Sequence, residues 1–110
     1  MRPGPFLFCL LLAPPALAED WHPLDGPAIR TALESRSLIY DDNTTQDFRP
    51  DGRTLYGTDS WGKWRVDGDR YCSAWPPSDA WACYDMAQDG LRLKFISDDG
   101  SESIGTYNDR

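Results

Sequence analysis

Four Asp-Gly pairs divide the chain from residue 51 onward: Asp51-Gly52, Asp67-Gly68, Asp89-Gly90 and Asp99-Gly100. Asp-Gly favours the left-handed backbone values of tight hairpin turns. The segments beside these pairs are rich in aromatic and β-branched residues, which favour strands. The pattern predicts a meander of seven or eight short antiparallel strands at 37–41, 46–49, 53–57, 61–66, 70–75, 80–86, 91–96 and 101–107. We therefore expect a mainly β fold, rolled into a small barrel or packed as a sandwich.

One short helix is expected before the strands, from about Pro27 to Glu34, with Asp25 or Gly26 as its N-cap. An apolar stripe would lie on one face of this helix and consist of Ala28, Ile29, Ala32 and Leu33. We expect the helix to cover an open end or edge of the sheet. Residues 19–24 are predicted to form an extended arm.

The first eighteen residues have the composition of an export signal. Arg2 precedes a short apolar run, and Ala16-Leu17-Ala18 is the small-x-small pattern that signal peptidase accepts. The apolar run is shorter than the roughly 20 residues that span a bilayer. The sequence predicts a signal peptide at 1–18 and a single domain at 19–110, exported to the periplasm or secreted, with no membrane insertion after cleavage.

Removal of the signal would leave two of the three cysteines, Cys72 and Cys83. In an exported protein, an even number of cysteines indicates a disulfide. Two thiols with a single distant histidine, His22, do not make a zinc site, and the spacing is not that of a Cys-x-x-Cys redox pair. We expect a structural disulfide, no metal and no cofactor.

A four-residue loop at 76–79 would place three complementary pairs in one strand register. Cys72 would lie opposite Cys83, Tyr71 opposite Tyr84, and Arg70 opposite Asp85. The same register would place Ala74 opposite Trp81 and Trp75 opposite Ala80. Cross-strand pairs of this kind each contribute about 0.2–1 kcal/mol.

Residues 62–85 read GKWRVDGDRYCSAWPPSDAWACYD. This block resembles a group of small exported proteins of alphaproteobacteria, a group that implies export but no particular biochemical activity. A dihydrodipicolinate reductase label attached to some members would imply a dinucleotide-binding site. The chain has neither the Gly-x-Gly-x-x-Gly motif nor a βαβ unit that such a site needs.

Gly62-Lys63-Trp64 also matches the short Gly-x-Trp element of lipocalins. In that family the element opens the first barrel strand, whereas here it lies in the middle of the chain, and the chain is short for a ligand-holding barrel of eight strands. The simpler interpretation is that Trp64 and Val66 point into the core while Lys63 and Arg65 point to solvent.

The net charge of −7 argues against nucleic acid and anionic membranes as partners. A Ser-His-Asp triad would require His22, which lies in the predicted arm. Most of the aspartates are expected to form turns rather than catalytic or calcium sites. A non-enzymatic interaction or ligand-binding module is therefore favoured; a small exported enzyme using surface carboxylates is the alternative.

Six aromatic residues fall between positions 61 and 84, and most of them should be core residues. Trp64 and Tyr71 could meet across the Asp67-Gly68 turn. Trp75 and Trp81 would flank a proline-rich hairpin tip, where full burial is rare. We therefore expect both to be more exposed than Trp64 and Tyr71. The predicted binding surface consists of Trp75, Pro76, Pro77, Asp79 and Trp81. Its partner would be a cationic protein or a small ligand, by analogy with small periplasmic lysozyme inhibitors.

Overall fold

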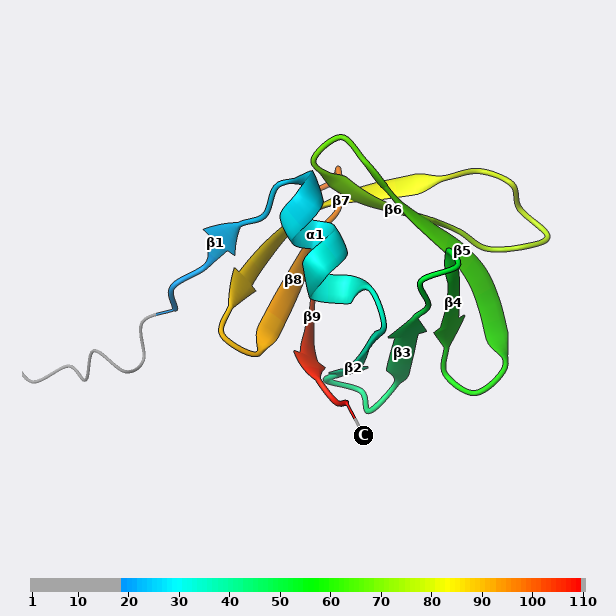
Figure 1. Cartoon of the computed structure of the whole chain (residues 1–110), viewed down its shortest axis with the longest axis horizontal. Coiled ribbons are helices and arrows are strands. Elements are labelled where there is room, and N and C mark those ends of the chain that lie inside the picture. The colour runs from blue at the N-terminus through cyan, green and yellow to red at the C-terminus, as the bar shows by residue number, and fades with distance from the viewer. Residues whose placement is uncertain (1–18, 110) are drawn as a thin grey trace, which may run out of the picture.

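The computed structural model describes residues 19–109 (Figure 1). The predicted signal peptide at 1–18 lies outside the described residues. The described part contains one helix and nine strands: β1 His22–Pro23, α1 Gly26–Leu33, β2 Arg36–Tyr40, β3 Thr45–Phe48, β4 Arg53–Tyr56, β5 Ser60–Asp67, β6 Arg70–Ala74, β7 Ala82–Asp89, β8 Arg92–Ile96 and β9 Glu102–Tyr107.

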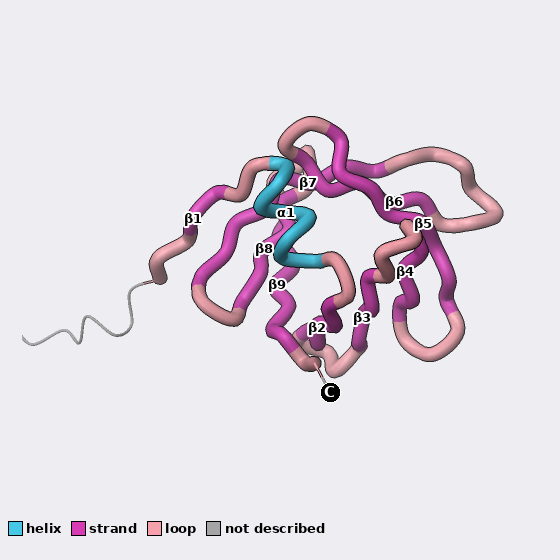
Figure 2. The backbone as a smooth tube through the Cα atoms, in the orientation of Figure 1, coloured by secondary structure: helices cyan, strands magenta, loops and turns pink. Residues whose placement is uncertain are grey.

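Strands β2 to β9 form a closed antiparallel barrel. Each strand pairs with the next along the chain, and β9 pairs back with β2, where Tyr40 lies opposite Gly105. Figure 2 shows short strands alternating with turns around this ring. The predicted meander is confirmed, and of the two expected architectures the barrel is the one observed. The chain is long enough for eight-stranded closure because each strand has only four to eight residues.

The Asp-Gly pairs lie in the turns where they were predicted. Gly52, Gly68, Gly90 and Gly100 all have positive φ values, between 61° and 89°. Residues with a side chain rarely adopt this backbone conformation, so glycine lets the chain reverse without strain. The observed strands differ from the predicted ones by at most three residues at their ends, the largest difference being the extension of β7 to Asp89.

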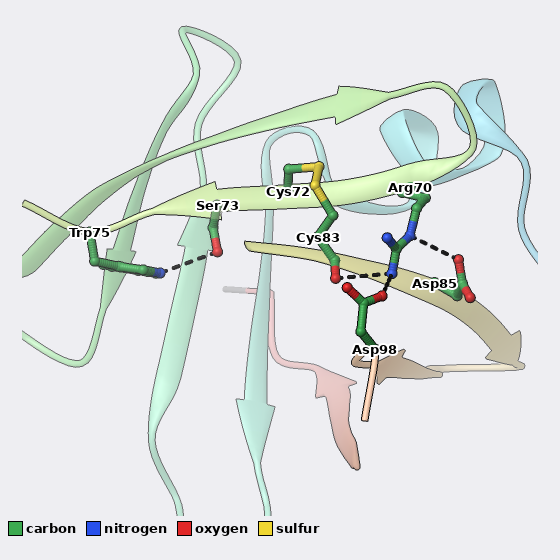
Figure 3. Close-up of a disulfide and its surroundings, with 7 residues drawn as sticks. All are labelled: Arg70, Cys72, Ser73, Trp75, Cys83, Asp85 and Asp98. Atoms are coloured by element: carbon green, nitrogen blue, oxygen red, sulfur yellow. Dashed lines mark hydrogen bonds and ion pairs between the residues drawn. A yellow bond between two sulfur atoms is a disulfide. The ribbon is translucent and has the colours of Figure 1, made fainter. Parts of the chain in front are cut away.

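The predicted register between β6 and β7 is confirmed at its centre. Tyr71 pairs with Tyr84, Cys72 with Cys83 and Ser73 with Ala82. The two sulfur atoms are bonded, and the Arg70 guanidinium lies 3.1 Å from the Asp85 carboxylate (Figure 3). The same guanidinium donates to the Cys83 carbonyl at 3.0 Å and pairs with Asp98.

The prediction of a four-residue loop was wrong. Strand β6 ends at Ala74 and β7 begins at Ala82, so the connection runs from Trp75 to Trp81. The expected ladder pairs Ala74 with Trp81 and Trp75 with Ala80 do not form. Instead, the Trp75 ring packs against Gly62 of β5, and the Trp81 ring lies beneath the Arg65 guanidinium, so neither residue continues the β6–β7 ladder.

Helix α1 closes one end of the barrel, as expected. The Asp25 side chain accepts a hydrogen bond from the Ala28 amide at 3.0 Å and caps the helix. Gly26 donates to the Asp69 carboxylate at 2.8 Å in the β5–β6 turn. A Cβ atom on Gly26 would lie 2.3 Å from the Gly68 carbonyl oxygen, so glycine permits this close approach.

The core lies between α1 and the inner wall of the barrel. It is formed by ten buried residues: Ile29, Ala32, Leu33, Leu38, Phe48, Trp64, Tyr71, Met86, Leu93 and Phe95. The Trp64 ring meets the edge of Phe48 at 5.7 Å between centroids and approaches Tyr71 at 6.4 Å, as predicted. Its indole N–H donates to the Arg49 carbonyl at 2.9 Å, which satisfies the buried donor.

The predicted arm also pairs with the barrel. His22 lies opposite Gln88 and Pro23 opposite Ala87, while the ladder between β6 and β7 reaches only to Tyr71 and Tyr84. Strand β1 therefore covers the edge of β7 beyond the end of β6. Sequence analysis predicted the extended conformation but not its partner, because a two-residue strand leaves no periodic pattern.

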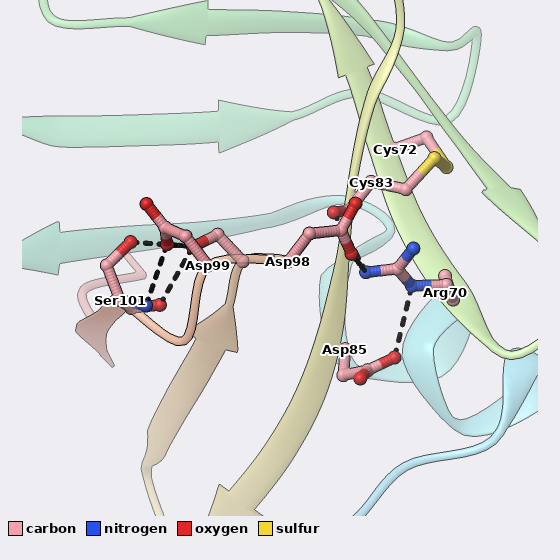
Figure 4. Close-up of polar contacts among 8 residues, drawn as sticks. Arg70, Cys72, Cys83, Asp85, Asp98, Asp99 and Ser101 are labelled. Atoms are coloured by element: carbon pink, nitrogen blue, oxygen red, sulfur yellow. Dashed lines mark hydrogen bonds and ion pairs between the residues drawn. A yellow bond between two sulfur atoms is a disulfide. The ribbon is translucent and has the colours of Figure 1, made fainter.

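The turn between β8 and β9 makes stability sensitive to acid. The Ser101 amide donates to the Asp99 carboxylate (Figure 4), as does the Ser97 hydroxyl, and these hydrogen bonds lower the pKa of Asp99 to about 2. In the unfolded chain an aspartate titrates near about pH 3.9. The stabilisation of the folded state by these hydrogen bonds is therefore complete above about pH 4 and is lost as the pH falls toward 2.

We expect the thermal midpoint of unfolding to fall less between about pH 6 and about pH 3 in Asp99→Asn than in the parent protein. If the thermal midpoints of the parent and of Asp99→Asn depended on pH in the same way, Asp99 would not be a source of the acid sensitivity.

Candidate binding cavity at the open end of the barrel

The barrel holds a cavity of about 660 Å³ at the end opposite α1. Apart from Tyr71, the second residue of β6, its lining residues come from the last residues of β2, β4, β6 and β8, the first residues of β3, β5, β7 and β9, and the connections between them. In an antiparallel barrel these segments meet at one end. The lining residues are Tyr40, Asp41, Asp42, Gln46, Tyr56, Ser60, Tyr71, Ser73, Trp75, Tyr84, Phe95, Glu102, Ser103 and Ile104.

Six of the fourteen residues that line the cavity are aromatic. Tyr40 lies 6.1 Å from Tyr56 and 6.2 Å from Phe95 between ring centroids, and Tyr56 meets the Trp75 ring edge-on at 6.1 Å. Phe95 extends the same contacts to Tyr84 at 6.5 Å. With Tyr71, six aromatic side chains line one continuous surface around the cavity.

A chain of hydrogen bonds links polar groups in the barrel interior below these rings. The Tyr40 hydroxyl donates to Gln46 Oε1 at 2.7 Å, and Gln46 Nε2 donates to the Thr54 hydroxyl at 2.9 Å. The Thr54 hydroxyl in turn donates to the Asp47 carbonyl at 2.7 Å. Gln46 is 5% exposed and Thr54 is fully buried. Because these groups satisfy one another, the interior tolerates them without the cost of unpaired buried polar atoms.

Burial keeps two of the cavity tyrosines protonated. It raises the pKa of Tyr40 far above its usual value. It also raises the pKa of Tyr71 to about 12, although hydrogen bonds with Ser73 and Gln46 act in the opposite direction. A tyrosine with its ordinary pKa of about 10 is already uncharged at neutral pH, and burial extends that state to more alkaline solution.

Trp75 follows β6 and turns into the cavity. Its indole N–H donates to the Ser73 hydroxyl at 3.2 Å (Figure 3). A Cβ atom on Gly62 would lie 2.5 to 2.8 Å from three carbon atoms of the Trp75 ring system. Glycine at position 62 therefore lets the ring lie flat against β5.

Of the five predicted binding residues, Trp75 lines the cavity and the other four do not. Trp81 lies on the outer wall, with the Arg65 guanidinium 4.0 Å from its ring centroid. Pro76, Pro77 and Asp79 are exposed in the connection. Trp75 and Trp81 are partly buried whereas Trp64 and Tyr71 are 3% and 4% exposed, so the predicted order of exposure is confirmed.

Sequence reasoning missed most of the cavity. The consecutive hairpins β2–β3 and β3–β4 bring Tyr40, Gln46 and Tyr56 together. Ser103 joins them only because β9 closes on β2, far from it along the chain. One signal was present. The alternation of Gln46 and Phe48 in β3 places both on the inner face, and a glutamine at an inward position marks a polar interior.

Three carboxylates lie at the mouth of the cavity. Asp42 accepts a hydrogen bond from the Thr44 amide at 2.9 Å, which lowers its pKa. Glu102 pairs with Lys94 at 3.5 Å. Asp41 and Asp42 form no ion pair among residues 19–109. The β2–β3 turn therefore contributes negative charge to the lip.

Neither a family model, nor a curated protein, nor a solved structure matches the chain. Within the described residues, no cluster of three or more His, Cys, Asp or Glu side chains is arranged to hold a metal ion. The same part of the chain contains no helix with the length and hydropathy needed to cross a bilayer.

Proposed function

We propose that this protein is an exported, non-enzymatic binding module that takes a small ligand into the open end of its barrel. The observation that carries the proposal is the aromatic cavity of about 660 Å³. Ligand sites are typically concave, of about 300–1,000 Å³, and lined by aromatic side chains with a few polar groups. Barrel mouths are one of the places where they occur.

The geometry favours binding over carboxylate catalysis. A general acid at neutral pH needs a carboxyl group whose pKa is raised. The hydrogen bond from the Thr44 amide lowers the pKa of Asp42 instead. Glu102 is held in an ion pair, with one carboxylate oxygen 3.5 Å from the Lys94 ammonium. The enzyme alternative therefore finds less support at this mouth than a binding role.

We also propose export, to the periplasm or outside the cell, and a relationship to the alphaproteobacterial group. The disulfide between Cys72 and Cys83 is compatible with an oxidising compartment. The small-x-small pattern at 16–18 supports cleavage before Glu19. The protein isolated from the source envelope should therefore have the intact mass of a chain that begins at Glu19.

The ligand site can be tested by filling it. Ser103 is exposed and lies opposite Phe95 in the β8–β9 ladder, so a large side chain at 103 would enter the cavity. Thr58 is exposed and does not line the cavity, so Thr58→Trp is the matched control. We expect small fragments that bind the parent in ligand-observed NMR to lose binding in Ser103→Trp and to keep it in Thr58→Trp.

Two results would contradict the proposal that the cavity is the ligand site. Fragments that bind Ser103→Trp as well as the parent would place the site elsewhere. Loss of binding in Trp81→Ala, with Ser103→Trp unaffected, would favour the tip surface predicted from the sequence.

A further inference from the structure

Most of the tryptophans in this protein are already covered by a cation from its own chain. Arg53 lies 4.5 Å from the Trp61 ring centroid, Arg65 lies 4.0 Å from Trp81, and Arg30 lies 5.4 Å from Trp64. The remaining case is Trp21, whose ring is approached by both Arg92 and Lys94, at 4.9 Å and 4.3 Å. Cations are attracted to the negative face of an indole ring.

Trp75 is the exception among the five tryptophans, which all lie in the described part of the chain. No Lys or Arg group of residues 19–109 stacks on its ring. One side of the ring lies against Gly62, and its neighbour Tyr56 meets it edge-on. Trp75 also lines the cavity, so a ligand there can reach the part of the ring that Gly62 and Tyr56 leave uncovered.

The charges around the cavity have the sign that a cation requires. Among the described residues that line it, none is Lys, Arg or His, while Asp41 and Asp42 lie at the lip. Glu102 is also at the lip, although Lys94 offsets its charge. A cation that entered would meet no positive side chain and would pass two carboxylates on the way in.

We propose that the cavity binds a small organic cation of the methylated ammonium type, seated against the Trp75 and Tyr56 rings. This inference rests on the proposed function. Methyl groups suit an aromatic wall, because a methylated cation is less strongly hydrated than a bare ammonium and loses less when water is removed. The neutral tyrosine rings and the uncompensated aspartates of the lip favour the cation over an anionic or neutral ligand.

A pair of probes with the same shape separates charge from shape. Choline carries a trimethylammonium group, and 3,3-dimethylbutan-1-ol replaces the charged nitrogen with carbon. We expect calorimetric titration of the folded, oxidised protein to give choline at least about tenfold higher affinity than the neutral alcohol. Higher ionic strength should narrow the difference, because salt screens the lip carboxylates.

Substitutions test whether choline binds in the cavity. Trp75→Leu should weaken choline binding by about tenfold or more, while Trp61→Leu, on the outer wall, should leave it unchanged. Asp42→Asn is a second variant that does not depend on the core. The asparagine side chain can still accept the Thr44 hydrogen bond, so we expect normal folding and an affinity for choline reduced by about two- to fivefold.

The outcomes distinguish this inference from the proposed function. Equal affinity for choline and the neutral alcohol would overturn the cation assignment, and the cavity would remain a ligand site. Failure of choline to bind, while other fragments bind the parent and not Ser103→Trp, would overturn it in the same way. If Ser103→Trp affects no fragment, the proposed function itself fails. Choline binding that survives both Trp75→Leu and Asp42→Asn would place the cation outside this cavity.

Discussion

Replacing Trp64 by alanine should lower the free energy of unfolding by about 3–5 kcal/mol. Trp64 is 3% exposed, and its ring packs against both Phe48 and Tyr71 in the core. The substitution would leave a cavity there and remove the donor that the Arg49 carbonyl uses. Urea denaturation at neutral pH measures the loss directly.

The matched control is Trp61→Ala, on the same strand but on its outer face. Trp61 is 42% exposed, and its main contact is the Arg53 guanidinium above the ring. We expect a change within about 1 kcal/mol, because neither a core cavity nor an unsatisfied buried group results. Losses of similar size in the two variants would contradict the assignment of inward and outward faces in β5.

Removing the disulfide should have the second largest effect. The bond between Cys72 and Cys83 closes a loop with a sequence separation of 11, and Cys72 is fully buried. Constraint of the unfolded chain by a loop of this size contributes about 3 kcal/mol. Replacing both cysteines by serine should therefore lower the free energy of unfolding by about that amount, less any contribution from strain.

Thiol chemistry provides an independent check on the same bond. The mature, oxidised protein, which lacks Cys9 of the predicted signal peptide, should contain no thiol that reacts with an alkylating agent, and its mass should increase by two hydrogens on reduction. Alkylation of both Cys72 and Cys83 in the native, air-isolated protein would contradict the β6–β7 pairing that the structure contains.

The part of the fold that could be predicted rests on local chemistry. Asp-Gly pairs predict hairpin turns because glycine tolerates positive φ, and the structure has positive φ at Gly52, Gly68, Gly90 and Gly100. The β6–β7 register followed from a disulfide, an aromatic pair and a charge pair that agree with one another. The Asp25 cap and the apolar face of α1 were also predicted from neighbouring residues in the sequence.

Barrel closure and the cavity could not be predicted in the same way. The pairing of β9 with β2 joins residues about as far apart as Leu38 and Tyr107, and no local pattern encodes it. The orientation of Trp75 depends on Gly62, a residue of another strand. From the sequence, Trp75 and Trp81 appear equivalent, yet one lines the interior and the other packs on the outer wall under Arg65.

The central claim is that ligands enter the open end of the barrel, and the indole N–H signals of the tryptophans test it most directly. In the ¹⁵N-labelled protein titrated with choline, we expect the Trp75 indole signal and the Gln46 side-chain amide signal to shift together and to saturate. The signals of Trp64, beneath α1, and of Trp81, on the outer wall, should stay in place. Saturable shifts at Trp81 without any change at Trp75 would contradict the account.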